Sequence, residues 1–224
     1  MTEYVTADSM TAELRRKVRK RAVIVSGGTV EDPLYYQGMF FEDDLIICAD
    51  SGYRTAQRLG LVPDVVIGDF DSFPEQEAVL GTKLVLPAEK DHTDTHECVC
   101  YALAQDVWEI VVIGAIGSRM DHTIANIHLL GIAMESGVAM KIVNEHNEIF
   151  LIRDTVKIPR REGWHFSLLP LEKTEGITLE GFYYPLRDAV MEFGNPYGVS
   201  NEFTAEEATV SIKKGLLLAI LSRD

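Results

Sequence analysis

The stretch VVIGDFDSF, residues 65–73, joins a short apolar run to two aspartates that are one residue apart. Residues 65–67 are apolar at successive positions, which is typical of a strand buried on both faces of a parallel sheet. Asp69 and Asp71 follow at once, although neighbouring carboxylates repel each other and each resists losing its water. Some feature of the folded protein must therefore offset the cost of keeping the two charges together.

Around this stretch, residues 21–143 alternate between strand-like and helix-like segments. Apolar runs predict strands at 22–25, 45–48, 65–67, 84–86, 110–113 and 140–143. Helical spacing predicts helices at 53–59, 93–105 and 120–135. Gly60 follows the first of these and is a suitable C-terminal cap. Strands that alternate with helices favour βαβ units and a mainly parallel sheet flanked by helices.

The pattern changes after about residue 144, where short β-rich runs are separated by Gly, Pro and charged turns. The runs lie at 149–152, 164–169, 177–179, 189–193, 209–212 and 216–221. No helical period of useful length appears, so an antiparallel β-sandwich is expected. The predicted fold class is therefore α/β, with three parts. They are an N-terminal extension (1–20), an α/β domain (21–143) and a C-terminal β-sandwich domain (144–224).

Composition limits the partners of the chain. The net charge is −14 and is uneven, since residues 1–21 carry six basic and three acidic side chains. Such an acidic protein is not expected to bind nucleic acid, because contacts to phosphates need Lys and Arg. Its charge suits a cationic small molecule, or an anion that is bound together with a divalent metal. Three cysteines without a framework spacing indicate reduced thiols in a cytoplasmic protein. Neither a signal peptide nor a membrane-spanning run is expected.

Polar residues collect where the predicted strands end. The segments are SGGT (26–29), ADSG (49–52), GDFDS (68–72), PAEKDHTD (87–94) and GAIGSRMDH (114–122). In an open parallel sheet, ligands bind beyond the carboxyl ends of the strands. Five consecutive strands are followed by Gly, Ser or Asp at one rim of the sheet. Turn chemistry alone does not readily explain this pattern. The sequence therefore predicts a binding site along this rim.

Each segment also has a plainer interpretation. SGGT is either a glycine turn or a backbone cradle for phosphate at a helix start, and it lacks the Lys of the Walker pattern. Asp50 and Ser51 could cap the next helix. Gly114 and Gly117 are three apart without a third glycine in place, so a nicotinamide cofactor is not supported.

The aspartates are harder to explain as caps. If residues 69–71 stay extended, Asp69 and Asp71 point to the same side, and two carboxylates together with substrate phosphates suit Mg²⁺. Asp91 and Asp94 lie three apart near a helix start, and Asp121 opens the next helix. The alternative is an accidental cluster of caps. A metal–phosphate site is the favoured interpretation.

The histidines offer a second ligand pattern. His92 and His96 are four apart, a spacing compatible with zinc. No third ligand is evident, so surface or capping roles are favoured for both. His122 lies beside Asp121 in the glycine-rich loop and is a better candidate for contact with a ligand.

Four of the segments are ADSG, GDFDS, KDHTD (90–94) and GSRMDHTIAN (117–126). In this order and at these intervals, they resemble the thiamine pyrophosphokinase family. GVSNEF (198–203) is similar to the family's substrate-binding segment. The resemblance spans about residues 22–221. It implies an α/β nucleotide-binding domain followed by a β-sandwich, in a homodimer with its active site between subunits. It also implies transfer of the diphosphoryl group of ATP to the hydroxyl of thiamine, giving thiamine diphosphate and AMP.

The resemblance further implies roles for individual residues. The Mg²⁺ and catalytic cluster would comprise Asp50, Asp69, Asp71 and Asp94, with Asp71 or Asp94 receiving or orienting the hydroxyl proton. The ATP side would comprise Gly27, Gly28, Ser51, Ser72, Lys90, Asp91, Thr93, Arg119, Asp121 and His122. Ser200 and Asn201 would meet thiamine from the partner subunit, with Tyr197 or Phe203 facing its rings.

Two alternatives to this function are open at this point. In a haloacid-dehalogenase-type phosphatase an apolar strand also ends in Asp-x-Asp, and Asp69 would be the nucleophile. The other alternative is a regulatory module that binds ATP and Mg²⁺ without turnover. The phosphatase leaves the later Asp-rich and glycine-rich segments unexplained.

Overall fold

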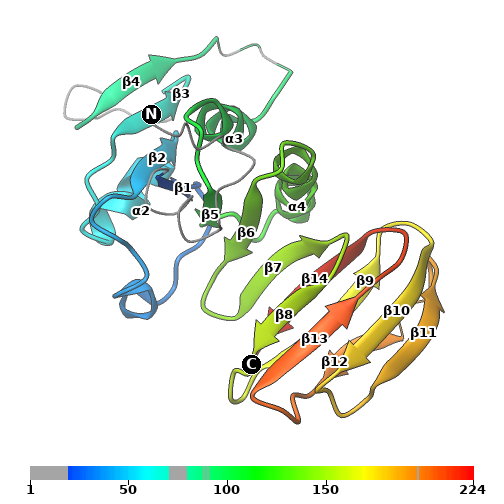
Figure 1. Ribbon diagram of the computed structural model, residues 1–224. Coiled ribbons are helices and arrows are strands. Elements are labelled where there is room, and N and C mark those ends of the chain that lie inside the picture. Colours follow the sequence, from blue (N-terminus) through cyan, green and yellow to red (C-terminus); the bar gives the residue numbers. More distant parts are fainter. Residues whose placement is uncertain (1–19, 71–79, 88, 90, 196) are drawn as a thin grey trace, which may run out of the picture. The chain divides into compact units, whose positions relative to one another are not determined.

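The computed structural model describes residues 20–70, 80–87, 89, 91–195 and 197–224 (Figure 1). Three predicted site residues, Asp71, Ser72 and Lys90, lie outside the described residues, as does nearly all of the N-terminal extension. The chain divides into two compact units, 1–140 and 141–224.

The first unit is built on five parallel strands. They are β1 (Arg21–Val25), β2 (Leu45–Ala49), β3 (Val65–Gly68), β4 (Thr82–Val85) and β5 (Glu109–Ile113). Their order is β5-β1-β2-β3-β4, and each neighbouring pair runs parallel. Every residue of β1 and β3 is buried, which explains the apolar run after Arg21 in β1 and the apolar sequence of β3. The predicted parallel sheet is confirmed.

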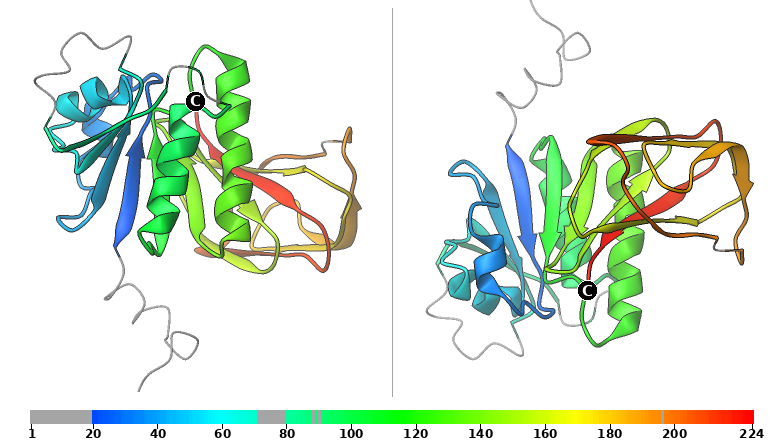
Figure 2. Two further views of the ribbon diagram at one scale, coloured as in Figure 1. Left: turned by 90° about the horizontal axis from the view of Figure 1, so that it is seen from above. Right: turned by 90° about the horizontal axis from the view of Figure 1, so that it is seen from below.

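Helices cover both faces of this sheet. They are α2 (Gly52–Arg58), α3 (Asp94–Ala104), α4 (Met120–Glu135) and the short 3₁₀ helix η2 (Pro33–Tyr36). Right-handed crossovers place α2, which leads outward from β2 to β3, on the face opposite α3, which leads back from β4 to β5. Figure 2 shows α2 and α3 on opposite faces, and α3 packs against α4.

The strand order reverses between β1 and β5. The chain moves outward from β1 to β4, and then returns to place β5 on the other side of β1. In a doubly wound sheet the two loops that leave such neighbours diverge to opposite faces, which opens a crevice at the carboxyl ends of the strands. The topology therefore places a binding site beyond Val25 and Ile113, the last residues of β1 and β5.

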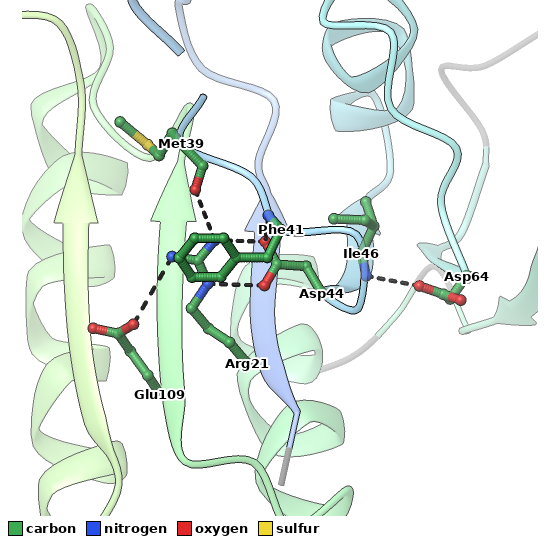
Figure 3. A network of polar contacts seen from close by, with 7 residues as sticks. All are labelled: Arg21, Met39, Phe41, Asp44, Ile46, Asp64 and Glu109. Carbon is green, nitrogen blue, oxygen red and sulfur yellow. Dashed lines mark hydrogen bonds and ion pairs between the residues drawn. The ribbon is translucent and has the colours of Figure 1, made fainter. Parts of the chain in front are cut away.

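The other end of β1 is closed by a buried ion pair (Figure 3). The Arg21 guanidinium donates to both carboxylate oxygens of Asp44, over 2.9 and 2.5 Å, and to the carbonyl of Met39 over 2.8 Å. It also stacks 4.1 Å above the Phe41 ring. Because all of these groups are paired, the charges can be buried, and they fix the loop that leads into β2.

The second unit is a β-sandwich, as predicted. One sheet contains β7 (Asn147–Ile152), β9 (His165–Pro170), β12 (Gly198–Asn201) and β14 (Leu217–Ser222), in the order β12-β9-β14-β7. The other contains β8 (Val156–Pro159), β10 (Thr174–Glu180), β11 (Leu186–Met191) and β13 (Glu207–Ser211), in the order β11-β10-β13-β8. All pairs are antiparallel. Side chains from both sheets, such as Phe166, Ile177 and Leu217, form one apolar core.

Strand β6 (Ala139–Val143) forms at the last strand that was predicted for the alternating α/β segments. Its residues 141–143 pair antiparallel with β7. The reason is the short connection at 144–146, where the Asn144 side chain accepts from the His146 N–H over 3.1 Å. So short a turn can only join antiparallel strands, because a parallel pair needs a long crossover.

Two strands of the sandwich were not expected from the sequence. β8 has the sequence VKIP and β12 has GVSN. Gly, Ser, Asn and Pro have low strand propensity, so pairing with neighbours decides these two segments. In the part of the chain that the structure describes, no helix is long and apolar enough to cross a membrane.

Candidate active site

A pocket of about 680 Å³ lies at the carboxyl edge of the parallel sheet. Residues that follow the strands form its walls: 26–29 after β1, 49–51 around the end of β2, Asp69 after β3 and 114–119 after β5. Residues 92–95 at the start of α3 and three residues of α4 complete the lining. All five predicted strand-end segments therefore reach one cavity, which surrounds the point where the strand order reverses.

Close packing of glycines forms the base of the pocket. A Cβ atom on Gly28 would lie 2.4 Å from the carbonyl oxygen of Gly114 and 2.8 Å from that of Ile116. The Gly28 N–H donates to the same Gly114 oxygen over 2.7 Å. SGGT is thus a tight turn packed against the loop after β5. No α-helix begins there among the described residues, so the helix-start form of the phosphate cradle is wrong.

Asp50 follows β2 in a left-handed conformation, with φ at 43°. Its side chain packs against the last residue of β3, because a Cβ on Gly68 would lie 3.0 Å from the Asp50 Cβ. Ser51 occupies the N-cap of α2, but its side chain makes no capping hydrogen bond. The capping interpretation is therefore wrong for the Ser51 side chain, and both residues line the pocket.

Asp69 also lines the pocket, but the chain does not stay extended beyond it. Phe70 has φ at 58°, and its side chain is 2% exposed. A left-handed aromatic residue is uncommon, and here it turns the ring into the core. The expectation of an extended 69–71 segment is therefore wrong at Phe70, and the argument that Asp69 and Asp71 share a side fails with it. Asp71 and Ser72 lie outside the described residues.

The start of α3 presents Asp94 to the pocket. Thr93 is the N-cap, and its side-chain oxygen accepts from the His96 N–H over 3.2 Å. Asp94 is the first residue of the helix, and it lines the pocket. Thr95 is joined to Ser26 by a buried hydroxyl–hydroxyl hydrogen bond of 3.0 Å, which ties α3 to the end of β1.

Arg119 and Asp121 form an exposed ion pair at the start of α4. The guanidinium donates to the two carboxylate oxygens over 3.2 and 2.5 Å. This hydrogen bond lowers the pKa of Asp121 to about 2. Arg119 and His122 line the pocket, whereas Asp121 and the exposed Asp91 do not. Asp121 therefore contacts Arg119, one of the pocket's walls, rather than the cavity.

Several pocket residues had no individual role in the sequence prediction, although some of them lie in the predicted strand-end segments. They are Ser26, Thr29, His92, Thr95, Ser118, Thr123 and Asn126, together with small apolar neighbours. Asn126 is buried and donates to the Ala115 carbonyl over 2.8 Å, so it holds the loop after β5. Its signal in the sequence was its place one turn after His122, at the end of the GSRMDHTIAN segment.

His92 and His96 have a third neighbour that the sequence did not reveal. Ligand atoms of His92, His96 and Glu97 all lie within 4.8 Å of one another. The statement that no third ligand is present is therefore wrong.

The two residues predicted to bind thiamine lie in the second unit. Ser200 is exposed, has φ at 60°, and donates its N–H to the Ser167 hydroxyl over 3.0 Å. The Asn201 amide is buried, with its Nδ2 donating to the Tyr184 carbonyl over 2.8 Å and its Oδ1 accepting from two backbone N–H groups. Asn201 is therefore engaged in holding the backbone beside Ser200.

The two aromatic candidates for stacking on thiamine differ in burial. Phe203 packs against Phe182 and Phe166, with ring centroids 5.1 and 6.3 Å apart, and belongs to the sandwich core. Tyr197 is 48% exposed and donates its hydroxyl to the Val190 carbonyl over 2.7 Å. Of the two, Tyr197 is accessible to a ligand.

All three cysteines are free thiols. Burial raises the pKa of Cys48 to about 12 and that of Cys98 well above its ordinary value. These two thiols are therefore protonated at neutral pH and serve as apolar core residues.

Two protein-family models match the chain. Thiamin pyrophosphokinase, catalytic domain, matches residues 36–142, and thiamin pyrophosphokinase, vitamin B1 binding domain, matches residues 153–217. The thiamine pyrophosphokinase of Bacillus subtilis is 32% identical over 209 residues, covering 90% of this chain and 98% of that protein.

Solved structures agree with these matches. The crystal structure of the Bacillus subtilis thiamine pyrophosphokinase superposes with a TM-score of 0.83 at 30% identity, covering 92% of this chain and 100% of that one. The thiamin pyrophosphokinase of Geobacillus thermodenitrificans gives 0.81 at 30% identity, covering 91% and 98%.

Proposed function

The chain belongs to the thiamine pyrophosphokinase family, and from that premise we propose how its pocket carries out the family reaction. The enzyme transfers the diphosphoryl group of ATP to the hydroxyl of thiamine, which yields thiamine diphosphate and AMP. Neither the phosphatase alternative nor the non-catalytic module is supported, because the matches run through both units and name one family.

The observation that carries the proposal is the convergence of Asp50, Asp69 and Asp94 on one pocket. Each comes from a different strand-end segment. Carboxylate oxygens are hard donors that suit Mg²⁺, so the donor set fits the metal that this chemistry requires. When bound, Mg²⁺ would neutralise charge on the phosphate oxygens as the P–O bond breaks. Asp71 is proposed as a further ligand from the sequence.

The ATP tail would lie over the base of the pocket. Gly27, Gly28 and Ser51 provide close backbone approach, and Thr93 and His122 line the walls. Arg119 would pair with phosphate oxygens, with Asp121 holding its guanidinium in place. Lys90, Ser72 and Asp91 are retained as ATP contacts on the sequence resemblance alone.

The attacking hydroxyl of thiamine must lose its proton. Asp94 or Asp71 would accept that proton or orient the hydroxyl. Asp94 is supported by its position, because it begins α3 and lines the pocket. The displaced AMP would leave from the base of the same cavity.

Thiamine would be bound by the second unit of a partner subunit in a homodimer. Ser200 is exposed and held in a strained backbone conformation, which is frequent at binding sites. Asn201 would position Ser200 rather than contact thiamine through Oδ1. Exposed large apolar side chains of the same unit, including Tyr183, Phe193 and Val199, support an interface on this unit.

Product analysis tests the proposed function. The full chain is incubated with ATP, MgCl₂ and thiamine, and nucleotides and thiamine esters are separated by chromatography. AMP and thiamine diphosphate should appear in equal amounts, and neither should form without thiamine or with excess chelator. Release of orthophosphate without thiamine diphosphate would contradict the proposal. A cytoplasmic location stays a prediction from the free thiols.

A further inference from the structure

A cluster of nitrogen and oxygen donors lies beside the pocket, apart from the carboxylates assigned to Mg²⁺. His92 precedes α3, and His96 and Glu97 lie in the first turn of that helix. Their side chains are 55%, 18% and 30% exposed, so an ion in solution can reach them. His92 also lines the pocket.

Two separations within this cluster are close to those around a tetrahedral metal. His92 Nδ1 lies 3.0 Å from Glu97 Oε1, and His96 Nδ1 lies 3.7 Å from the same oxygen. Ligand atoms about 2.1 Å from a tetrahedral ion lie roughly 3.4 Å from each other. The two observed distances fall on either side of that value. The two imidazole rings are tilted by 41° to each other, with centroids 4.0 Å apart.

We propose that His92, His96 and Glu97 bind a divalent transition metal of the zinc class at the edge of the pocket. Two imidazoles and one carboxylate favour Zn²⁺ over Mg²⁺ or Ca²⁺, which prefer oxygen ligands. Three protein ligands leave a fourth position for water or for a group that enters the pocket. Cys100 lies one turn further along, with Sγ 4.0 Å from both His96 ring nitrogens, as a neighbouring soft donor.

The competing explanation is a simple hydrogen bond between His92 and Glu97 without any ion. That contact would leave His96 without a function in metal binding. It would also give the cluster no preference between zinc and other cations. The two explanations therefore predict different effects of replacing His96 on the affinity for zinc.

Zinc titration of the full chain, purified without a polyhistidine tag, tests the proposal. ZnCl₂ is titrated in competition with a chromophoric chelator, with excess MgCl₂ present to saturate the carboxylate site. One Zn²⁺ should bind per chain. His96→Gln and Glu97→Gln should each weaken binding by about tenfold or more, since even groups that only support a ligand cost 10–100-fold. His128→Gln, on the exposed face of α4, should bind like the unaltered chain.

Cobalt substitution provides a second measurement. Co²⁺ in a tetrahedral nitrogen–oxygen site absorbs visible light strongly, whereas Co²⁺ held by carboxylates and water absorbs weakly. The strong band should be present in the unaltered chain and lost in His96→Gln. Circular dichroism checks that the variants fold. An absence of saturable zinc binding under excess Mg²⁺, or equal affinity in His96→Gln, would overturn the proposal. The measurement uses no substrate, so its outcome is independent of the diphosphokinase reaction.

Discussion

Among single residues, Asp94 is the most direct test of the carboxylate cluster. Asp94→Asn removes one charge from the pocket while Thr93 still caps α3. Turnover should fall by about a hundredfold or more, as when one electrostatic contact to a transition state is lost. The unfolding free energy should change by no more than about 1 kcal/mol, the effect of one charge on the helix dipole. Steady-state kinetics and urea unfolding measure the two quantities.

Asp43 supplies the matched control for this substitution. It is an exposed aspartate of the same unit and lies outside the pocket. Asp43→Asn should keep normal turnover. Equal losses in the two variants would mean that the pocket is sensitive to net charge alone. Normal turnover in Asp94→Asn would remove this carboxylate from the mechanism.

The Arg119–Asp121 pair makes a prediction about pH. The hydrogen bond from Arg119 lowers the pKa of Asp121 from 3.8 to about 2. A depressed pKa means that the pair stabilises the folded state fully above pH 4, and that this contribution is lost as pH falls toward 2. Arg119→Gln should therefore move the Asp121 pKa back toward 3.8. Carboxyl carbon chemical shifts, followed by NMR from neutral pH to the onset of acid unfolding, give the value.

Lys83 is an exposed cation on β4, a different element from this pair, so Lys83→Gln is the control. The Asp121 titration should be the same in Lys83→Gln as in the unaltered chain. An Asp121 pKa that does not move in Arg119→Gln would show that the guanidinium is not its partner in solution.

Among the elements, the loops after β1 and β5 depend on glycine for their close approach. In Gly28→Ala the new Cβ would meet two backbone carbonyl oxygens that cannot move aside. Overpacking of this kind costs roughly 1–3 kcal/mol, and here it would also push the two loops apart. Urea unfolding should show a lower free energy, and the KM for ATP should rise.

Gly131 offers the opposite case within α4. A Cβ on Gly131 meets no atom within 4 Å. Gly131→Ala should therefore raise the free energy of unfolding by up to about 1 kcal/mol, because Ala is the better helix former. Equal effects of the two substitutions on stability would contradict the close packing at Gly28.

Most elements were predictable because their signals are local. The buried strands β1 (after Arg21) and β3 are apolar runs in the sequence, and α4 was predicted with its observed bounds. β12 could not be predicted from its own residues, since GVSN acquires a strand conformation only by pairing with β9. The antiparallel pairing of β6 with β7 is set by the three-residue turn between them rather than by the apolar sequence of β6.

The site was predictable in position but not in geometry. Strand ends in a parallel sheet meet at one edge, so the convergence of Asp50, Asp69 and Asp94 followed from the pattern. The left-handed turn at Phe70 did not, because nothing in the local sequence favours that conformation. The Arg119–Asp121 and His92–Glu97 contacts depend on side-chain directions that spacing alone does not determine.

For the whole molecule, the two units are proposed to bind different substrates. A substitution in one unit should therefore change the KM for one substrate more than the KM for the other. Ser200→Ala should raise the KM for thiamine more than the KM for ATP, because Ser200 belongs to the second unit and the aspartate pocket to the first. Initial rates measured against each substrate in turn give both constants. Equal increases in the two constants would undermine the assignment of Ser200.

The proposed homodimer makes a prediction about mixed subunits. If each active site takes Asp94 from one chain and Ser200 from its partner, hybrids of Asp94→Asn and Ser200→Ala contain one unaltered site. Activity at low thiamine should then rise above the average of the two parent proteins after subunit exchange. Activity equal to that average would place both residues in sites made by a single chain.

The central claim is that this pocket moves a diphosphoryl group rather than a single phosphoryl group. The most direct test is the fate of ATP that is radiolabelled at its β-phosphorus, incubated with Mg²⁺, thiamine and the full chain. The label should appear entirely in thiamine diphosphate, with none in AMP, and Asp94→Asn should slow its transfer. Label that stays with the adenosine as ADP would contradict the account.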